Sequence, residues 1–133
     1  MENNTVFGKI IQGEIPATKV YEDEKCLAFM DINPVSKGHT LLVPKTGFGR
    51  IEVVPDEILS YLIQRVKFLV IAMKAGIPCD FVQVDIVGKD IPDHFHIHLI
   101  PRLETDDVNV FSHVIYDEGE ATVFAEKIKK FLK

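Results

Sequence analysis

Three histidines stand at alternate positions in the segment Asp93–Arg102, which reads DHFHIHLIPR. Alternate side chains of an extended strand point to the same face, so we expect His94, His96 and His98 to share one face and the apolar residues between them to enter the core. Neutral imidazole can attack phosphorus as a nucleophile, and a protonated neighbour can donate to an oxygen or to the leaving group. The pattern predicts catalysis at a phosphorus centre.

Two other interpretations of the histidine strand remain open. Alternating polar residues can simply form the solvent-facing side of a strand whose other face is buried. Imidazole is also a common transition-metal ligand, although three histidines on one straight strand make a poor tetrahedral cage without a further ligand. A metal-dependent hydrolase would lose its activity on chelation, which separates this interpretation from the first.

The length, composition and charge of the whole chain limit the class of protein to which it can belong. It has 133 residues, 47% of them hydrophobic, and a net charge of -5, which fits one ordinary domain without a global basic field for nucleic acid or an anionic membrane. Cys26 and Cys79 match no CxxC pattern, and we interpret them as thiols in a reducing compartment. The N-terminus does not resemble a secretory signal, and no apolar run approaches the ~20 residues of a membrane span. We expect a cytoplasmic protein that binds neither nucleic acid nor membrane.

The elements that must position the histidines follow one another in an α+β order. Pro55 suits a helix start, Asp56 and Glu57 suit its first turn, and Gly76 is placed to cap its end. The full set is a short amphipathic segment at 6–12, strands at 19–22, 26–32 and 39–44, the helix at 55–75, strands at 81–87 and 94–100, and a last helix at about 120–132. This order predicts a single domain over 1–133, with an antiparallel sheet of about five strands and a long helix and terminal helices packed on it.

Several segments, taken in order along the chain, resemble the histidine triad (HIT) superfamily, whose mark is His-x-His-x-His followed by apolar residues. Besides the histidine strand, the resemblance is carried by Phe7–Pro16, Val20–Asp23, Leu27–Pro34 and Gly38–Lys45. It covers residues 5 to 102 and is nearest to the Hint-like, nucleotide-binding branch. A C-terminal extension with a helix at about 118–133 lies outside it.

The resemblance implies a HIT-like fold and a nucleoside monophosphate transferase or hydrolase that needs no cofactor. Typical family substrates are adenosine phosphoramidates, or dinucleoside polyphosphates in another branch, so we expect a purine nucleotide such as AMP as the ligand. Family members are commonly homodimers that pair their sheets edge to edge. A nucleotide-binding or scaffold protein with little catalytic activity is the alternative.

The resemblance also assigns roles to single residues. His96 would be the nucleophile, His98 would contact the phosphate and orient His96, and His94 would assist proton transfer. Asp31 would accept hydrogen bonds from the ribose hydroxyls, since a carboxylate can take both donors of a diol, although it could instead only organise a turn. An apolar base pocket, which could equally be ordinary core, would be lined by Phe7, Ile10, Ile15, Phe29 and Ile32.

The sequence departs from the family pattern where many bacterial relatives bind structural zinc. Those relatives use a Cys-x-x-Cys pair, a later histidine and the first histidine of the triad. Thr5, Gly8 and Gly47 stand at the matching positions here, so three ligands are missing together. We predict no metal site, which leaves His94 free for another role.

A second departure is the acidic loop before the triad. Relatives usually carry an amide or hydroxyl where this chain has Asp85, Asp90 and Asp93. These carboxylates would repel a phosphate unless they are protonated, paired with Lys89 or turned away, so activity or substrate preference is expected to differ. The roles of three further residues are left open by the sequence: His39 at a strand start, Arg102 after the triad, and His113, which we expect on the surface.

Overall fold

The computed structural model describes residues 5–87 and 94–132. Its elements are α1 (Val6–Ile11), β1 (Lys19–Glu22), β2 (Cys26–Met30), β3 (Thr40–Pro44), the 3-10 helix η1 (Ile51–Val53), α2 (Asp56–Gly76), β4 (Phe81–Ile86), β5 (Ile97–Arg102) and α3 (Glu120–Lys129). Every helix and strand expected from the sequence is therefore present, with ends that differ by a few residues. Within the described ranges, no helix is both long and apolar enough to cross a membrane.

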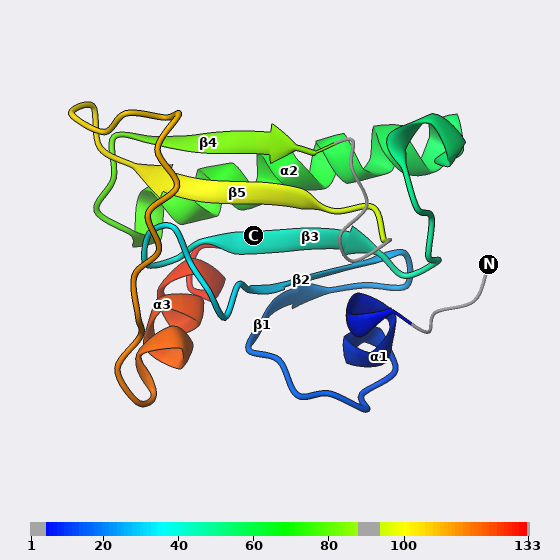
Figure 1. The fold of residues 1–133 in the computed structure, drawn as a ribbon, viewed down its shortest axis with the longest axis horizontal. Coiled ribbons are helices and arrows are strands. Elements are labelled where there is room, and N and C mark those ends of the chain that lie inside the picture. The colour runs from blue at the N-terminus through cyan, green and yellow to red at the C-terminus, as the bar shows by residue number, and fades with distance from the viewer. Residues whose placement is uncertain (1–4, 88–93, 133) are drawn as a thin grey trace.

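The five strands form one antiparallel sheet in the order β1-β2-β3-β5-β4. The long helix α2 lies across one face of the sheet together with α3, and α1 lies on the opposite face near β1 and β2 (Figure 1). This arrangement confirms the predicted α+β class and the five-strand sheet. Of the helices in residues 5–87 and 94–132, none covers the face of β5 and β4 that lies away from α2.

Strand alternation divides the core into two clusters. All five residues of β2 are buried, because its alternate side chains enter different clusters. Cys26, Ala28 and Met30 pack with α2 and α3, whereas Leu27 and Phe29 pack with α1. The α1 cluster thus forms a floor on the sheet face that carries the histidines.

The histidine strand begins later than the sequence predicts. β5 starts at Ile97, and its first partner in β3 is Leu42, so His94 and His96 precede the ladder and lie outside the strand. The amide of Phe95 donates instead to the carbonyl of Phe48. The predicted alternation still holds, because Phe95 and its successors at positions 97 and 99 all enter the α2 cluster.

Gly76 has a different role from the cap that the sequence suggests. It is the last residue of α2, and it is not among the positive-φ glycines of the described chain, which are Gly13, Gly38 and Gly119. A Cβ at this position would lie 2.1 Å from the carbonyl oxygen of Lys127. Glycine is needed here because the backbones of α2 and α3 approach each other closely.

Candidate functional site

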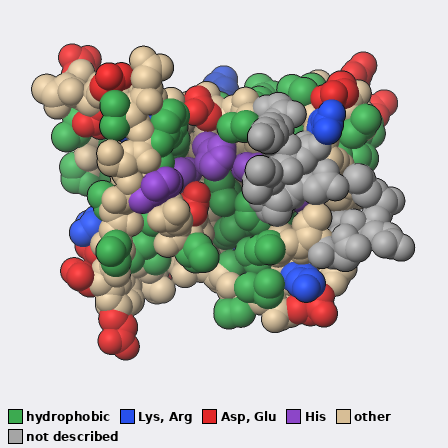
Figure 2. Space-filling view, in the orientation of Figure 1, with side chains coloured by type: hydrophobic (Ala, Val, Ile, Leu, Met, Phe, Trp, Pro, Cys, Tyr) green, Lys and Arg blue, Asp and Glu red, His purple; other side chains and the backbone are tan. Residues whose placement is uncertain are grey.

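Histidine side chains form a row across the face of the molecule that α2 does not cover (Figure 2). The rings of His96 and His98 meet edge to face, with centroids 4.9 Å apart. The ring of His39, which precedes β3, lies 5.1 Å from that of His98. The fold therefore brings a fourth imidazole, from a segment 59 residues away, into contact with the triad.

His96 is held in a defined orientation and tautomer. Its Nδ1–H donates to the carbonyl of His94 over 2.8 Å, which leaves the lone pair on Nε2. The edge of its ring meets Phe7, with centroids 5.0 Å apart, and the residue is 8% exposed. A neutral imidazole oriented in this way is a nucleophile with its reactive atom preset.

His98 receives its tautomer from a chain of hydrogen bonds that begins in the backbone. The amide of Val35 donates to Nδ1 of His39 over 3.0 Å, so the proton of this buried ring is on Nε2. That Nε2–H donates to Nδ1 of His98 over 2.9 Å, and His98 therefore carries its own proton on Nε2. This series of hydrogen bonds leaves the N–H on Nε2 of His98 as a donor beside His96, suited to a non-bridging phosphate oxygen.

Burial keeps this pair of rings uncharged. Burial, with a smaller contribution from the charge of His98, lowers the pKa of His39 to about 3. Burial and, to a smaller extent, the charge of His96 together lower the pKa of His98 to about 4. Both rings are neutral at neutral pH, as the hydrogen-bond chain requires.

Asp31 lies at the end of β2 and is tied to the same loop as His39. Its amide donates to the carbonyl of His39, and its Oδ1 accepts the amide of Asn33 over 2.8 Å. Its Oδ2 lies 3.5 Å from Nε2 of His39. Burial raises the pKa of the Asp31 carboxyl, against the effect of the Asn33 hydrogen bond and of nearby histidine charge. Asp31 thus organises the turn and also places a carboxylate oxygen beside the imidazoles.

Gly38 makes this loop possible. It has a φ of +100°, and a Cβ there would lie 2.4 Å from Cδ1 of Ile77. Its amide donates to the hydroxyl of Tyr116 over 2.9 Å, so the C-terminal segment braces the loop directly before His39. Only glycine combines this backbone angle with so close an approach.

His94 is buried, and both of its ring nitrogens have partners. Nε2–H donates to the carbonyl of Pro44 over 3.0 Å, and Nδ1 lies 3.2 Å from the hydroxyl of Thr5, which in turn accepts the amide of Gly8. His94 therefore fastens the N-terminus of α1 to the histidine segment. Assistance to proton transfer, implied for His94 by the family resemblance, stays a prediction.

The positions that would hold structural zinc in related proteins do not fit a metal. A hydroxyl and two glycines replace the missing ligands, and the hydroxyl of Thr5 already serves the N-terminus of α1 as its cap. The remaining ligand, His94, uses both ring nitrogens in the hydrogen bonds described above. Thr5 and His94 are therefore engaged as hydrogen-bonding partners, and the residues at these positions do not form a set of metal ligands.

A second candidate metal cluster consists of Asp31, His39 and His98, whose ligand atoms lie within 4.8 Å of one another. A metal on Nε2 of His39 would require the proton there to leave. Nδ1 cannot take that proton, because it already accepts the amide of Val35. The cluster fits a hydrogen-bonded pair beside a carboxylate better than a resident metal.

The residues expected to line a base pocket are only partly brought together. Phe7 packs edge to face on Phe29, with centroids 5.6 Å apart, and Ile15 packs against the same α1 cluster. Ile10 and Phe29 are buried within it. Ile32 lies apart from the cluster and is 94% exposed. The structure thus offers an apolar wall around Phe7, next to His96, and separates Ile32 from it.

The sequence missed two neighbours of the site. His39 was signalled only by its place after Gly38 at the start of a strand. His113 is exposed, as expected, but its Nδ1–H donates to the carbonyl of Asn33, and its charge lowers the pKa of both Asp31 and His39. No local pattern marks His113, because its segment meets the loop after β2 from 80 residues away.

The acidic loop is described only in part. Asp85 lies on β4, opposite His98 on β5. Lys89, Asp90 and Asp93 lie outside the described residues. Arg102 donates from Nε to Oε1 of Gln83 and from Nη2 to the carbonyl of Val110, and it forms no ion pair with a carboxylate of the described residues.

Comparison with known proteins gives one consistent result. The family model described as the HIT domain matches residues 12–105. The chain is 36% identical over 110 residues to the adenylylsulfatase HINT3 of Arabidopsis thaliana, covering 80% of this chain but only 56% of that longer protein. It is 34% identical over 105 residues to the adenosine 5'-monophosphoramidase HNT1 of Candida albicans, covering 73% and 69% of the two chains. A crystal structure of a Hit-like protein from Bartonella henselae, described as involved in cell-cycle regulation, superposes with a TM-score of 0.90 at 33% identity over 99% of this chain and 98% of that one.

Proposed function

Because the chain belongs to the HIT domain family, we propose that it is a nucleotide hydrolase or nucleotidyl transferase that acts on a purine nucleoside 5'-phosphoramidate or dinucleoside polyphosphate. One observation carries the proposal. The ring of His96, with its lone pair on Nε2, contacts the ring of His98, whose proton is fixed on Nε2 by the hydrogen bond from His39. Two relatives named as nucleotide hydrolases support the substrate class.

The reaction runs in two displacements. Nε2 of His96 attacks phosphorus, the bond from phosphorus to the leaving group breaks, and the leaving group departs with the electron pair and takes up a proton. Water then attacks phosphorus, the bond to Nε2 breaks, and the proton released by water balances the one taken earlier. Nucleoside monophosphate leaves, and His96 returns to its neutral form. Throughout, the carbonyl of His94 accepts from Nδ1–H and stabilises the positive charge of the nucleotidylated ring.

The nucleoside side of the substrate is assigned to Asp31 and the α1 wall. The carboxylate of Asp31 accepts from the ribose hydroxyls through the lone pairs that Asn33 does not use. The wall around Phe7, with Ile10, Ile15 and Phe29 behind it, receives the base. Ile32, which is 94% exposed and does not pack on this wall, is left out of this assignment. AMP is the simplest ligand that uses all of these groups.

The proposal is tested with adenosine 5'-phosphoramidate and the His96→Ala variant. We expect kcat/KM to fall by at least about a thousand-fold, as for other enzymes that lose their nucleophile. Rapid acid-free quenching and intact-mass spectrometry of the wild-type protein should show a nucleotidyl adduct that maps to the peptide containing His96. Ser60→Ala, on the exposed side of α2, is the control for nonspecific loss.

The alternative is a nucleotide-binding protein with little catalysis. Asp85 is the observation that favours it, because a carboxylate opposite His98 opposes binding of an anionic phosphate. Tight AMP binding without turnover on any phosphoramidate or polyphosphate would select this alternative. Equal turnover by the wild type and His96→Ala would remove the nucleophile assignment instead.

A further inference from the structure

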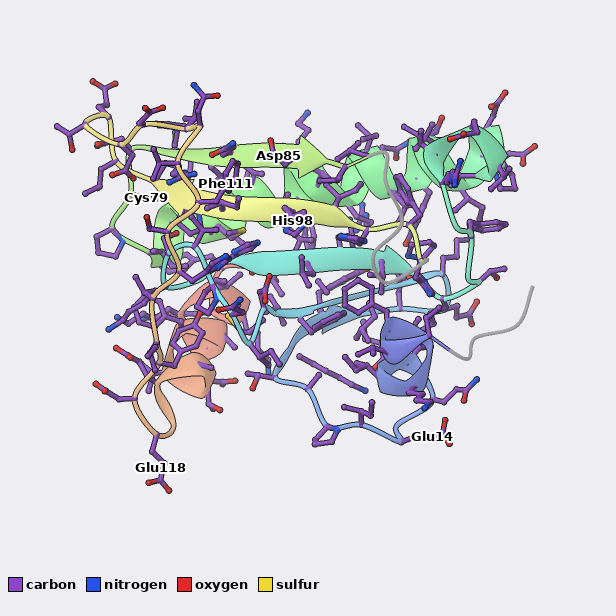
Figure 3. All side chains as sticks on the ribbon, viewed as in Figure 1. Glu14, Cys79, Asp85, His98, Phe111 and Glu118 are labelled. Carbon is purple, nitrogen blue, oxygen red and sulfur yellow. The ribbon has the colours of Figure 1, made fainter. Side chains whose placement is uncertain are left out.

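The carboxylate of Asp85 shares a sheet face with the catalytic imidazoles. Asp85 on β4 is the direct cross-strand partner of His98 on β5, and Figure 3 labels both side chains on these neighbouring strands. Directly opposed residues of an antiparallel pair have Cβ atoms about 5 Å apart and project to the same side. The negative charge of Asp85 acts on His98, where it opposes the lowering of the pKa by burial.

Asp85 is held in place by a polar chain along the same face. Nε2 of Gln83 donates to Oδ1 of Asp85 over 3.3 Å, and Oε1 of Gln83 accepts Nε–H of Arg102 over 2.8 Å. Arg102 is 6% exposed and is itself fixed by a bond from Nη2 to the carbonyl of Val110. A buried arginine therefore orients the amide of Gln83, and that amide in turn holds the carboxylate of Asp85.

The sheet order places Asp85 on the side of the histidines away from the nucleoside. Asp31 ends β2, and α1 packs on β2 and β3, whereas β5 stands between these strands and β4. A phosphorus atom at His96 with its nucleoside toward α1 has β4 on its other side. The groups that approach Asp85 are therefore those attached to phosphorus opposite the nucleoside, and the leaving group is among them.

We propose that Asp85 is a specificity residue that binds a positively charged group on the leaving-group side of phosphorus. Its carboxylate attracts a leaving amine that carries a second, cationic group, and it repels an anionic leaving group such as a nucleoside polyphosphate. The inference rests on the proposed function and narrows its substrates to phosphoramidates of cationic amines. The positive charge of the leaving amine, placed between Asp85 and the phosphate oxygens, also reduces the repulsion between the carboxylate and the phosphate.

Three conjugates of AMP test the proposal through the same phosphorus–nitrogen bond. The amines are 1,2-diaminoethane, n-propylamine and glycine, which give the leaving group a positive, zero or negative charge at nearly constant size. We expect kcat/KM of the wild type to fall in that order, by about fivefold to tenfold per charge step. In Asp85→Asn the three values should converge. Asp56→Asn, an exposed carboxylate at the start of α2, should keep the wild-type order.

Binding supplies a readout that does not depend on turnover. Calorimetry with the three conjugates and His96→Ala should give the same order of Kd, and the order should disappear when Asp85→Asn is added. Equal values for the three conjugates in the wild type, or an unchanged order in Asp85→Asn, would overturn the role of Asp85 while leaving the enzyme in place. Absence of turnover with a charge order preserved in Kd would remove the proposed function and keep the role of Asp85.

Discussion

At the scale of single residues, the chemistry depends on where each imidazole carries its proton. Val35 fixes the tautomer of His39, and His39 fixes that of His98. The carbonyl of His94 does the same for His96 with no side chain involved. Among the residues that the structure describes, the lone pair on Nε2 of His96 and the N–H on Nε2 of His98 have no partner. A ring that can act as a nucleophile therefore lies beside a ring that can donate, and both are neutral.

The buried pair predicts an acid-sensitive fold. His39 and His98 have folded-state pKa values of about 3 and about 4, below the ordinary value of 6.5. The unfolded chain therefore binds more protons between these values, so their contribution to stability is full above pH 6.5 and is lost as the pH falls toward 4. Urea unfolding should show a lower free energy of unfolding at pH 4.5 than at pH 7.5.

The variant His39→Phe serves as the comparison for this prediction. It retains a buried ring and removes one of the two titrating groups, so the dependence of stability on pH between 7.5 and 4.5 should become shallower. Stability that does not change over this range in the wild type would contradict the assignment of neutral, buried imidazoles.

At the scale of elements, the site is built from segments that lie far apart in the sequence and are joined by hydrogen bonds. The loop between β2 and β3 carries Asp31 and His39 and is braced by Tyr116 and His113 from the C-terminal segment. α1 is fastened to the triad through Thr5. α2 and α3 support the sheet from the other face, and their backbones meet at Gly76. The layers on both faces therefore determine the position of the imidazoles.

The contact between α2 and α3 gives a prediction about stability. In Gly76→Ala the new methyl group would meet the carbonyl of Lys127 and force the two helices apart. We expect a loss of about 1–3 kcal/mol in the free energy of unfolding, the usual size for overpacking, which chemical denaturation can measure. Ala75→Ser, at the exposed neighbouring position, should change stability by less than about 0.5 kcal/mol. A neutral effect of Gly76→Ala would show that the helices can separate without cost.

At the scale of the whole molecule, the sheet has two outer strands, β1 and β4. β4 exposes two apolar side chains, Val84 at 43% and Ile86 at 37%. An outer strand with exposed apolar side chains is suited to pairing with a second copy of itself. This agrees with the homodimer that the family resemblance implies, which we retain as a prediction.

Sedimentation equilibrium tests the dimer directly. We expect the wild type to have twice the mass of the 133-residue chain, and Val84→Lys combined with Ile86→Lys to be monomeric because the new charges oppose pairing of the strands. Val123→Lys, on the exposed side of α3, should remain dimeric. A monomeric wild type, or a variant that keeps the wild-type mass, would rule out pairing through β4.

The sequence alone determined the features that depend on neighbouring residues. The alternation of histidine and apolar residues predicted which side chains enter the core, and helical spacing predicted α2 almost to its ends. The ordered motifs also identified the family. Local patterns suffice for these features, because a strand or helix face is set by residues a few positions apart.

Only the tertiary structure decided how the three histidines are employed. The partners of His98 and His94 come from segments 59 and 89 residues away, and Asp85 meets His98 through strand register. Such contacts depend on strand order and on how loops close, which no local periodicity encodes. The triad predicted from the sequence is thus one part of a larger hydrogen-bonded network, in which His39 sets the position of the proton on His98.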